Sequence, residues 1–421
     1  MTLKIAKQYK NMEDKSHAME SSGGALISLL CRNAADTYHN DDSTTFWKSK
    51  IIPVHEFAME TVELHRWSNE DYGTSSTMAN LSIAGDMLHK LTLEISPFQI
   101  PSGARLVQGW PRILFEQCIL HVGGVEFKTY GRLMQILMDL NHGTSNAMKD
   151  MACMHVAASN TSHVYVDLPF FFDKHATTGL PTVHTTDDLE IAFMFATIKE
   201  IFTTITGAEY DDSGHENVPS FRLLGTFVTL PKAHVASLIA QPQEYVIETH
   251  ALVGEQTNVN TSMAIIDLTC RHCTKELIVA IHSNDNLSKP HTYCIEDNSP
   301  LKDRLHCERI QLYVDNKLRE WYQASAMHHA LVNTVKHHKN SPTSGVMCMP
   351  FCSSPDSLQP SGTLNFGRFS FKHLHVSGLR PGSYAIYVYA IQYELLHVIR
   401  GKHQLYNFSD LQDEVAEGIV E

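Results

Sequence analysis

The sequence lacks an excess of positive charge. Acidic residues outnumber basic ones across its 421 residues, and the formal net charge is −13. A protein that mainly grips phosphate backbones usually carries a basic face. No cluster of Lys and Arg stands out, so we do not expect direct contact with nucleic acid.

Long apolar runs are also missing. The opening MTLKIAKQYK has no apolar stretch behind a basic region and predicts no signal peptide. The longest apolar-looking run, Tyr384–Ile399, contains Gln392, Glu394 and His397 and is too short to cross a bilayer. The sequence therefore predicts a soluble chain.

No catalytic motif is complete. The sequence has no Gly-x-Ser-x-Gly elbow, no phosphate-binding loop and no HExxH helix. His373, His375 and the Asp187-Asp188 pair are the residues that most invite a catalytic role, and we interpret them as solvated loop residues. We expect a protein that is not an enzyme, with no catalytic and no cofactor-binding residue.

The nine cysteines follow no regular framework, which is typical of reduced thiols in a cytoplasmic compartment. Cys270 and Cys273 could form half of a zinc site, but a structural site needs four ligands. Other candidate ligands are Cys348, Cys352, His328, His329, His337 and His338. No spacing matches a zinc finger, and the Cys pair directly precedes a predicted strand at Leu277–Ile281, so we expect no metal site.

Short alternating patterns dominate what the sequence does contain. Period-two alternation predicts strands with one buried face. It occurs at Leu91–Ile95, Val164–Leu168, Leu189–Phe195, Ile310–Val314 and Tyr384–Tyr393. Gly123-Gly124 fits a two-residue hairpin turn, and Asp315-Asn316 fits one less strongly.

Helical patterns are few. Leu133, Ile136, Leu137 and Leu140 follow helical spacing, and Leu26, Leu29 and Leu30 predict a short helix near the N-terminus. Another short helix is expected between Pro231 and Pro242. Many strands with few helices favour β-sandwiches.

The chain also repeats itself weakly. EFAMETVEL (Glu56–Leu64) resembles EYVIETHAL (Glu244–Leu252), and the two turn pairs Gly123-Gly124 and Asp315-Asn316 correspond. Val166-x-Leu168-Pro169-Phe170 resembles Met347-x-Met349-Pro350-Phe351. Three matches in the same order predict a duplicated domain of about 190 residues, within the usual size range of domains. Chance similarity between amphipathic strands is the alternative.

Several segments together point to a known family. They are GALISLLCRNAADTYH (Gly24–His39), FAME (Phe57–Glu60), GDML (Gly85–Leu88), HVGGVEFKTYG (His121–Gly131), LPFFF…GLP (Leu168–Pro181) and QPSGTLNFGRF (Gln359–Phe369). In this order they resemble the major capsid proteins of nucleocytoplasmic large DNA viruses, iridoviruses and algal viruses in particular. The last segment is the most specific, although Gly367 stands where the family usually has Ser.

The resemblance implies an all-β fold of two tandem eight-stranded jelly-roll β-sandwiches (a double jelly roll) with a few short helices. We expect an N-terminal arm at 1–44, a first jelly roll at 45–230, a helical linker at 231–242, a second jelly roll at 243–408 and a C-terminal tail at 409–421.

The resemblance also implies a function. It identifies a structural subunit whose homotrimers form pseudo-hexagonal capsomers that tile the icosahedral capsid of a large double-stranded DNA virus. Expected partners are further copies, neighbouring capsomers, minor capsid and penton proteins, and the inner membrane layer. The expected location is the virion, with synthesis and assembly in the host cytoplasm.

Two departures keep alternatives open. GKHQLYNF after Arg400 replaces a glycine-rich segment of the family, and 26 histidines are unusual. A minor double-jelly-roll capsid paralogue is therefore one alternative. A carbohydrate-binding or hydrolytic β-sandwich is another, because jelly rolls also serve lectins and glycosidases.

Overall fold

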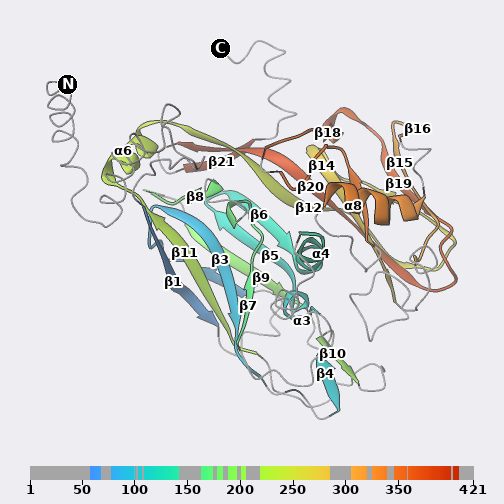
Figure 1. Cartoon of the computed structure of the whole chain (residues 1–421), viewed down its shortest axis with the longest axis horizontal. Helices are drawn as coiled ribbons and strands as arrows, with labels where there is room; N and C mark the ends of the chain where they lie inside the picture. The colour runs from blue at the N-terminus through green and yellow to red at the C-terminus, as the bar shows by residue number, and fades with distance from the viewer. Residues whose placement is uncertain are drawn as a thin grey trace, which may run out of the picture.

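The computed structural model shows two β-sandwiches side by side, joined by a short helix (Figure 1). It describes residues 57–67, 77–98, 100, 103–106, 109–141, 163–173, 178–183, 188–196, 201–204, 219–284, 305–319, 325–338, 346–357, 359–399 and 402–406. The expected arm at 1–44, the tail at 409–421 and the helix at Leu26–Leu30 lie outside these ranges.

The first sandwich is built from residues of the N-terminal half. One sheet holds β1 (Ala58–Trp67), β11 (Phe221–Thr229), β3 (Met87–Ile95) and β7 (Val164–Asp167) in that order, with β8 (Leu180–Pro181) also paired to β3. The facing sheet holds β2 (Thr77–Asn80), β9 (Leu189–Phe195), β5 (Phe115–Val122) and β6 (Val125–Tyr130). A separate ribbon pairs β4 (Ala104–Leu106) with β10 (Phe202–Thr204).

The second sandwich repeats this order of strands. Its first sheet holds β12 (Gln243–Val259), β20 (Tyr384–Ile399), β14 (Cys273–Ser283) and β17 (Met347–Pro350), with β18 (Leu364–Asn365) beside β14 and β21 (Lys402–Tyr406) beside β20. Its second sheet holds β13 (Met263–Asp267), β19 (Lys372–Ser377), β15 (Arg309–Val314) and β16 (Lys317–Leu318). Each sandwich is thus a jelly roll, and the predicted fold class is confirmed.

The three sequence repeats fall on corresponding strands. EFAMETVEL and EYVIETHAL overlap β1 and β12, the first strand of each jelly roll. The turn pairs close the hairpins β5–β6 and β15–β16, where Asp315 and Asn316 adopt φ of 47° and 60° and Gly123 adopts 61°. The third repeat covers β7 and β17. Positive φ is the conformation that such tight hairpin turns need.

The helices lie mainly where the periodicity predicts them. α4 (Gly131–Asn141) carries the Leu133–Leu140 pattern, and α6 (Lys232–Ala240) starts after Pro231. Short helical segments also occur at α3 (Trp110–Ile113), η2 (Phe171–Asp173) and η7 (Phe366–Arg368), and η6 (His328–Val332) leads into α8 (Asn333–His337). No described helix is long and apolar enough to cross a membrane.

Two strands of the second jelly roll serve both sandwiches. β12 and β20 pair along most of their length and extend from the second jelly roll across the first, towards α6 and β21 (Figure 1). Ile247 of β12 and Leu396 and Val398 of β20 belong to the same apolar core as the first jelly roll's Trp67 and Phe193. The second jelly roll keeps a separate core around residues such as Leu277 and Ile386.

The expectation of a strand with one buried face is wrong for β20, and its neighbour β14 is buried on both faces too. Nine consecutive residues of β14, Thr274–His282, are buried, and β20 is buried on both faces along most of its length. The physical reason is that helices cover the outer face of this sheet, so neither face of these strands meets water.

One local boundary also differs from expectation. Cys273 is the first residue of β14, so the Cys pair does not lie wholly before the strand. After Gly362, whose φ is 135°, the strand β18 covers only Leu364–Asn365. It gives way to a 3-10 turn in which Asn365 Oδ1 accepts a hydrogen bond of 2.9 Å from the Gly367 amide.

Candidate functional site

The first jelly roll contacts the second through α4. Gly131 directly follows β6 and begins this helix, whose Leu133, Ile136 and Leu140 are fully buried. They pack against Ile278, Ala280, Val346, Cys348, Tyr389 and Ile391 on the outer face of the β12–β20–β14–β17 sheet. We call this set the inter-roll cluster. It buries apolar surface between two halves that each have a core of their own.

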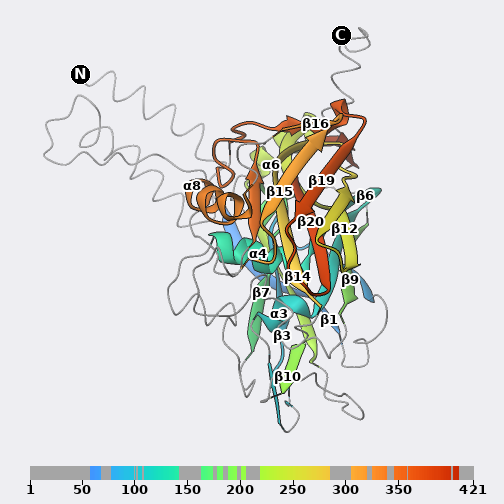
Figure 2. The same ribbon diagram turned by 90° about the vertical axis from the view of Figure 1, so that its right-hand side faces the viewer.

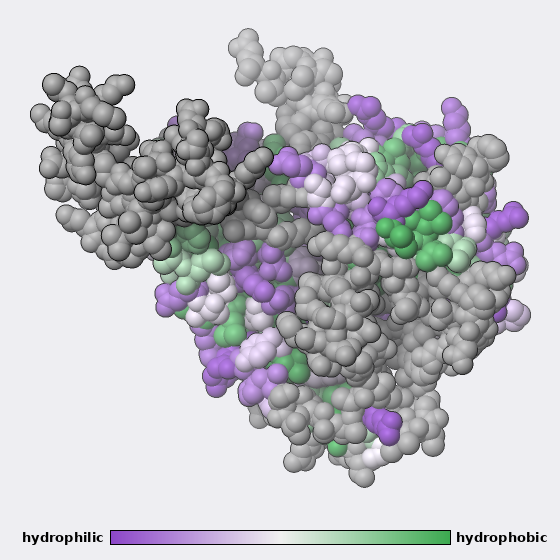
Figure 3. Space-filling view, in the orientation of Figure 1, coloured by the Kyte–Doolittle hydropathy of each residue, from purple (hydrophilic) through white to green (hydrophobic). Residues whose placement is uncertain are grey.

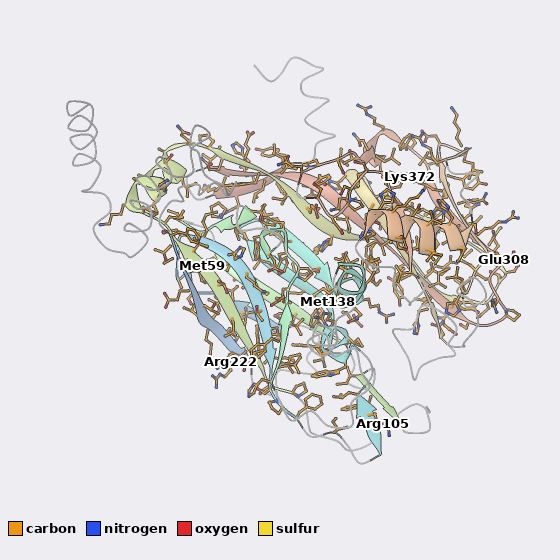
Figure 4. All side chains as sticks on the ribbon, in the orientation of Figure 1. Met59, Arg105, Met138, Arg222, Glu308 and Lys372 are labelled. Atoms are coloured by element: carbon orange, nitrogen blue, oxygen red, sulfur yellow. The ribbon has the colours of Figure 1, made fainter. Side chains whose placement is uncertain are left out.

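The outer face of the corresponding sheet in the first jelly roll is very different. Arg222 Nε donates to Glu94 Oε2 at 2.7 Å, and its Nη1 lies 3.3 Å from Glu63 Oε2. Lys90 Nζ lies 2.7 Å from Asp167 Oδ2. Figure 4 shows Met59 and Arg222 on the left of the molecule, at the strands β1 and β11. Polar side chains that pair with one another thus cover this face, where the second jelly roll's sheet has apolar side chains packed under α4.

The ion pairs of this face change the properties of its groups. Hydrogen bonds to Arg66 and then to Arg222 hold the pKa of Glu63 below its usual value. Exposed pairs of this kind contribute little to stability, but they fix the direction of their side chains. The face is therefore an ordered polar surface, with Met59 and Tyr165 as half-exposed apolar members.

The segment η6–α8 follows β16, just as α4 follows β6, and it lies beside α4 in two perpendicular views (Figures 1 and 2). It packs on β17, yet Val335 of α8 is 59% exposed. Apolar atoms lie over α8 within a polar surround (Figure 3). α8 packs on its own sheet with one side and exposes the apolar Val335 to solvent, so its outer side is a candidate surface for contact with another protein chain.

A buried ion pair lies at the edge of the second jelly roll. Lys275 Nζ donates to Glu248 Oε1 at 2.6 Å and to the Pro355 carbonyl oxygen at 2.7 Å, while its side chain is 2% exposed. Tyr393 presents its ring 5.7 Å from the same ammonium. A buried lysine without such partners would be very costly, so this arrangement holds β12, β14 and the Pro355 turn together.

A second buried group combines three kinds of ligand atom. Glu276 of β14, His338 at the end of α8 and Cys348 of β17 are all buried, and their ligand atoms lie within 4.8 Å of one another. His338 Nε2 is 2.7 Å from Glu276 Oε1, and His338 Nδ1 is 3.3 Å from Asp356 Oδ1. Burial alone would lower the pKa of His338, but hydrogen bonds to Asp356, Cys348 and Glu276 raise it well above its ordinary value.

The sequence prediction named His338 and Cys348 as ligand types but missed Glu276. The structure does not bring the Cys270–Cys273 pair to them, since neither cysteine belongs to the only such group among the described residues. Burial raises the pKa of Cys270, Cys307 and Cys348 to about 12. These thiols stay protonated at neutral pH, and the six described cysteines are free.

The residues proposed as catalytic candidates do not form a site. His373 Nδ1 lies 2.6 Å from Asp267 Oδ1 on the exposed face of β13–β19, and the His375 ring packs 4.2 Å from that of Tyr313. Both histidines lie in strand β19 and not in a loop, so the expectation of loop residues is wrong for them. Asp188 lies apart from them, just before β9, and Asp187 lies outside the described residues.

Two family models match the chain. The model described as "Major capsid protein N-terminus" covers residues 45–225, and that described as "Large eukaryotic DNA virus major capsid protein" covers residues 236–378. The major capsid protein of Pyramimonas orientalis virus is 22% identical over 415 residues, which span 90% of this chain and 98% of the relative. That of Phaeocystis pouchetii virus is 21% identical over 518 residues, with the same coverage.

Solved structures agree on the fold. The quasi-atomic model of the PBCV-1 virus capsid matches with a TM-score of 0.73 at 17% identity, over 86% of this chain and 99% of that one. The Faustovirus major capsid protein matches with a TM-score of 0.64 at 9% identity, over 88% and 96%. With a jelly roll in each half and a family model matching each half, this chain belongs to the major capsid proteins of large eukaryotic DNA viruses.

Proposed function

We propose that this capsid protein forms a homotrimer in which the second jelly roll of one copy packs against the first jelly roll of the next. Three chains then present six similar sandwiches in a ring with a nearly hexagonal outline, which can tile an icosahedral shell. A closed ring requires a heterologous contact, in which two different surfaces meet.

The contact of α4 within one chain supports this proposal most directly. α4 follows β6 of the first jelly roll and covers the outer face of the β12–β20–β14–β17 sheet in the second. The segment η6–α8 occupies the corresponding place after β16. Repeating the same relation between copies brings α8 onto the outer face of the β1–β11–β3–β7 sheet of a neighbour.

The two surfaces have the features that this contact needs. α8 exposes Val335, and the outer face of the first sheet exposes Met59 and Tyr165 among paired charges. We expect the apolar residues at the centre of the contact and the charge pairs at its solvent-accessible rim, where they avoid the cost of desolvation. Stable interfaces between subunits commonly bury about 2,000 Å² or more in total.

The remaining parts of the proposal concern organisation and partners. Residues 45–230 and 243–408 form the two jelly rolls, 231–242 the linker, and 1–44 and 409–421 the arm and tail. The arm contacts minor capsid proteins or the inner membrane layer, and penton proteins join the capsomers at special lattice positions. The protein is made and assembled in the host cytoplasm, and it has no catalytic or cofactor-binding residue. The family of structural capsid proteins to which it belongs supports the last point.

The mass of the full-length protein in solution tests the trimer. We expect light scattering to give the mass of three 47.4 kDa chains, and two-dimensional class averages to show a compact particle with a hexagonal outline. A monodisperse monomer across micromolar concentrations would contradict the proposal.

A substitution on α8 tests the proposed contact itself. Val335→Asp places a charge in the interface and should shift the protein towards monomer. Val335→Ile, at the same position, keeps the apolar contact and should leave the trimer intact. Trimers that survive Val335→Asp unchanged would show that α8 is not the contact, even if the trimer itself stands.

A further inference from the structure

The group formed by Glu276, His338 and Cys348 contains three side-chain types that bind metal ions, whereas a structural hydrogen bond needs only two polar groups. A carboxylate, an imidazole and a thiol converge from β14, α8 and β17, and the three residues are 0%, 8% and 0% exposed. Such a combination is costly to bury without compensation. We propose that these three residues bind a zinc ion that fastens α8 to the sheet.

The geometry suits Zn²⁺. Zinc binds Cys sulfur at about 2.3 Å, His nitrogen at about 2.0–2.1 Å and carboxylate oxygen at about 2.0–2.2 Å, in tetrahedral sites. Ligand atoms around such an ion are roughly 3.3–3.8 Å apart. The three ligand atoms lie within 4.8 Å of one another. An ion fits between them after His338 Nε2 and Glu276 Oε1, now 2.7 Å apart, separate by about 0.6 Å or more to reach the tetrahedral spacing.

The surroundings of His338 add a second carboxylate. Asp356 Oδ1 lies 3.3 Å from Nδ1, which has no well-formed hydrogen bond, while Nε2 lies 2.7 Å from Glu276 Oε1. Zinc-ligating histidines commonly donate their second N–H to a carboxylate, which fixes the tautomer and the direction of the ring. Asp356 is close enough to take this role when Nε2 binds the ion.

One ligand atom also lacks a partner. Glu276 Oε2 is buried and accepts no hydrogen bond from any described residue. A carboxylate oxygen left this way normally costs about 1–3 kcal/mol or more. Bound to the ion as well, it supplies the fourth ligand atom that a structural zinc site needs, which reverses the expectation from sequence that no metal binds. Cys348 stays a thiol without the ion and loses its proton to solvent when it coordinates, because metals bind thiolates.

Other metals fit less well. Mg²⁺ and Ca²⁺ prefer sites made only of oxygen ligands, while a mixed sulfur, nitrogen and oxygen set suits zinc among the abundant cations. The ion has a structural role here. It joins the helix that carries Val335 to the two strands on which that helix packs.

Elemental analysis of the purified full-length protein tests the inference. When the protein is expressed in medium supplemented with zinc, it should contain about one zinc ion per chain, as expected of a structural site. Cys348→Ser and His338→Gln should each lower this to less than about one tenth. Cys307→Ser, which changes another buried thiol outside the group, should leave the zinc content unchanged.

A second measurement on the unmodified chain does not depend on folding of variants. Co²⁺ bound at this site should give the near-ultraviolet charge-transfer band of a cobalt–thiolate bond. Absence of zinc from the supplemented protein, together with no such band after Co²⁺ addition, would overturn the proposal. So would equal zinc loss in Cys307→Ser and Cys348→Ser. The trimer mass is measured separately, so failure here leaves the proposed assembly untouched.

Discussion

Ile136 provides a direct test of the inter-roll cluster. Its side chain is fully buried on α4, in the cluster that also contains Ile278, Ala280 and Tyr389 of the other jelly roll. Ile136→Ala removes three carbon atoms, which costs about 2.4 kcal/mol at roughly 0.8 kcal/mol per buried carbon. The cavity left behind raises the total destabilisation to about 3–4 kcal/mol.

Thermal unfolding at a fixed protein concentration measures this loss, because assembly makes the transition depend on concentration. For an unfolding unit the size of one jelly roll, we expect the midpoint to fall by roughly 6–16 °C. The variant should also unfold in two separable steps, because the cluster is the main apolar connection between the rolls beyond the shared strands.

Met138 supplies the control on the same helix. It is half-buried and lies outside the cluster, so Met138→Ala should cost less than about 1 kcal/mol. Equal midpoints for Ile136→Ala and Met138→Ala would refute the conclusion that α4 binds the two jelly rolls together.

Three further predictions follow from single positions. A Cβ at Gly131 would lie 2.1 Å from the carbonyl oxygens of Arg112 and Phe115. Gly131→Ala should therefore lower the free energy of unfolding in urea by more than about 2 kcal/mol. Gly124→Ala is the control and should not destabilise the protein, because its Cβ would meet nothing within 4 Å. Lys275→Met removes the buried ammonium that binds Glu248 Oε1 and the Pro355 carbonyl oxygen, and it should cost about 3–5 kcal/mol. The double change with Glu248→Leu should recover most of this, and no recovery would mean that the pair is not coupled. Burial raises the pKa of Glu394 from 4.5 to about 7, so the folded state retains a proton that the unfolded state loses. Stability is therefore highest below about pH 4.5 for this group and falls by on the order of 3 kcal/mol as pH rises to about 7; Glu394→Gln should flatten that part of the curve of unfolding free energy against pH.

Local patterns determined which strands and helices the sequence could predict. Alternation at Leu189–Phe195, the Gly123-Gly124 turn and the spacing of Leu133 and Ile136 each depend on neighbours within a few residues. All three are confirmed. Burial of the outer faces of β14 and β20 was not predictable in the same way, since it arises from helices far away in the chain.

The buried ligand group shows the same limit. Cys348 and His338 are recognisable by residue type, whereas Glu276 stands in Lys275-Glu276-Leu277, where a charged pair before an apolar run reads as the solvated start of a strand. Its partner His338 is 62 residues away. Only the packing of α8 on β14 and β17 makes the carboxylate a neighbour of the other two groups.

The strands shared by both sandwiches have a consequence for how the protein is made. The first jelly roll receives Leu396 and Val398 into its core, so a nascent chain that has already completed β11 must wait for β20 to emerge from the ribosome. At about 5–20 residues per second this delay is roughly 10–30 s. During that time apolar surface of the first half stays open, which favours chaperone binding. A translation product that stops before β20 leaves both sandwiches unfinished, so only chains that include this late strand can fold both jelly rolls.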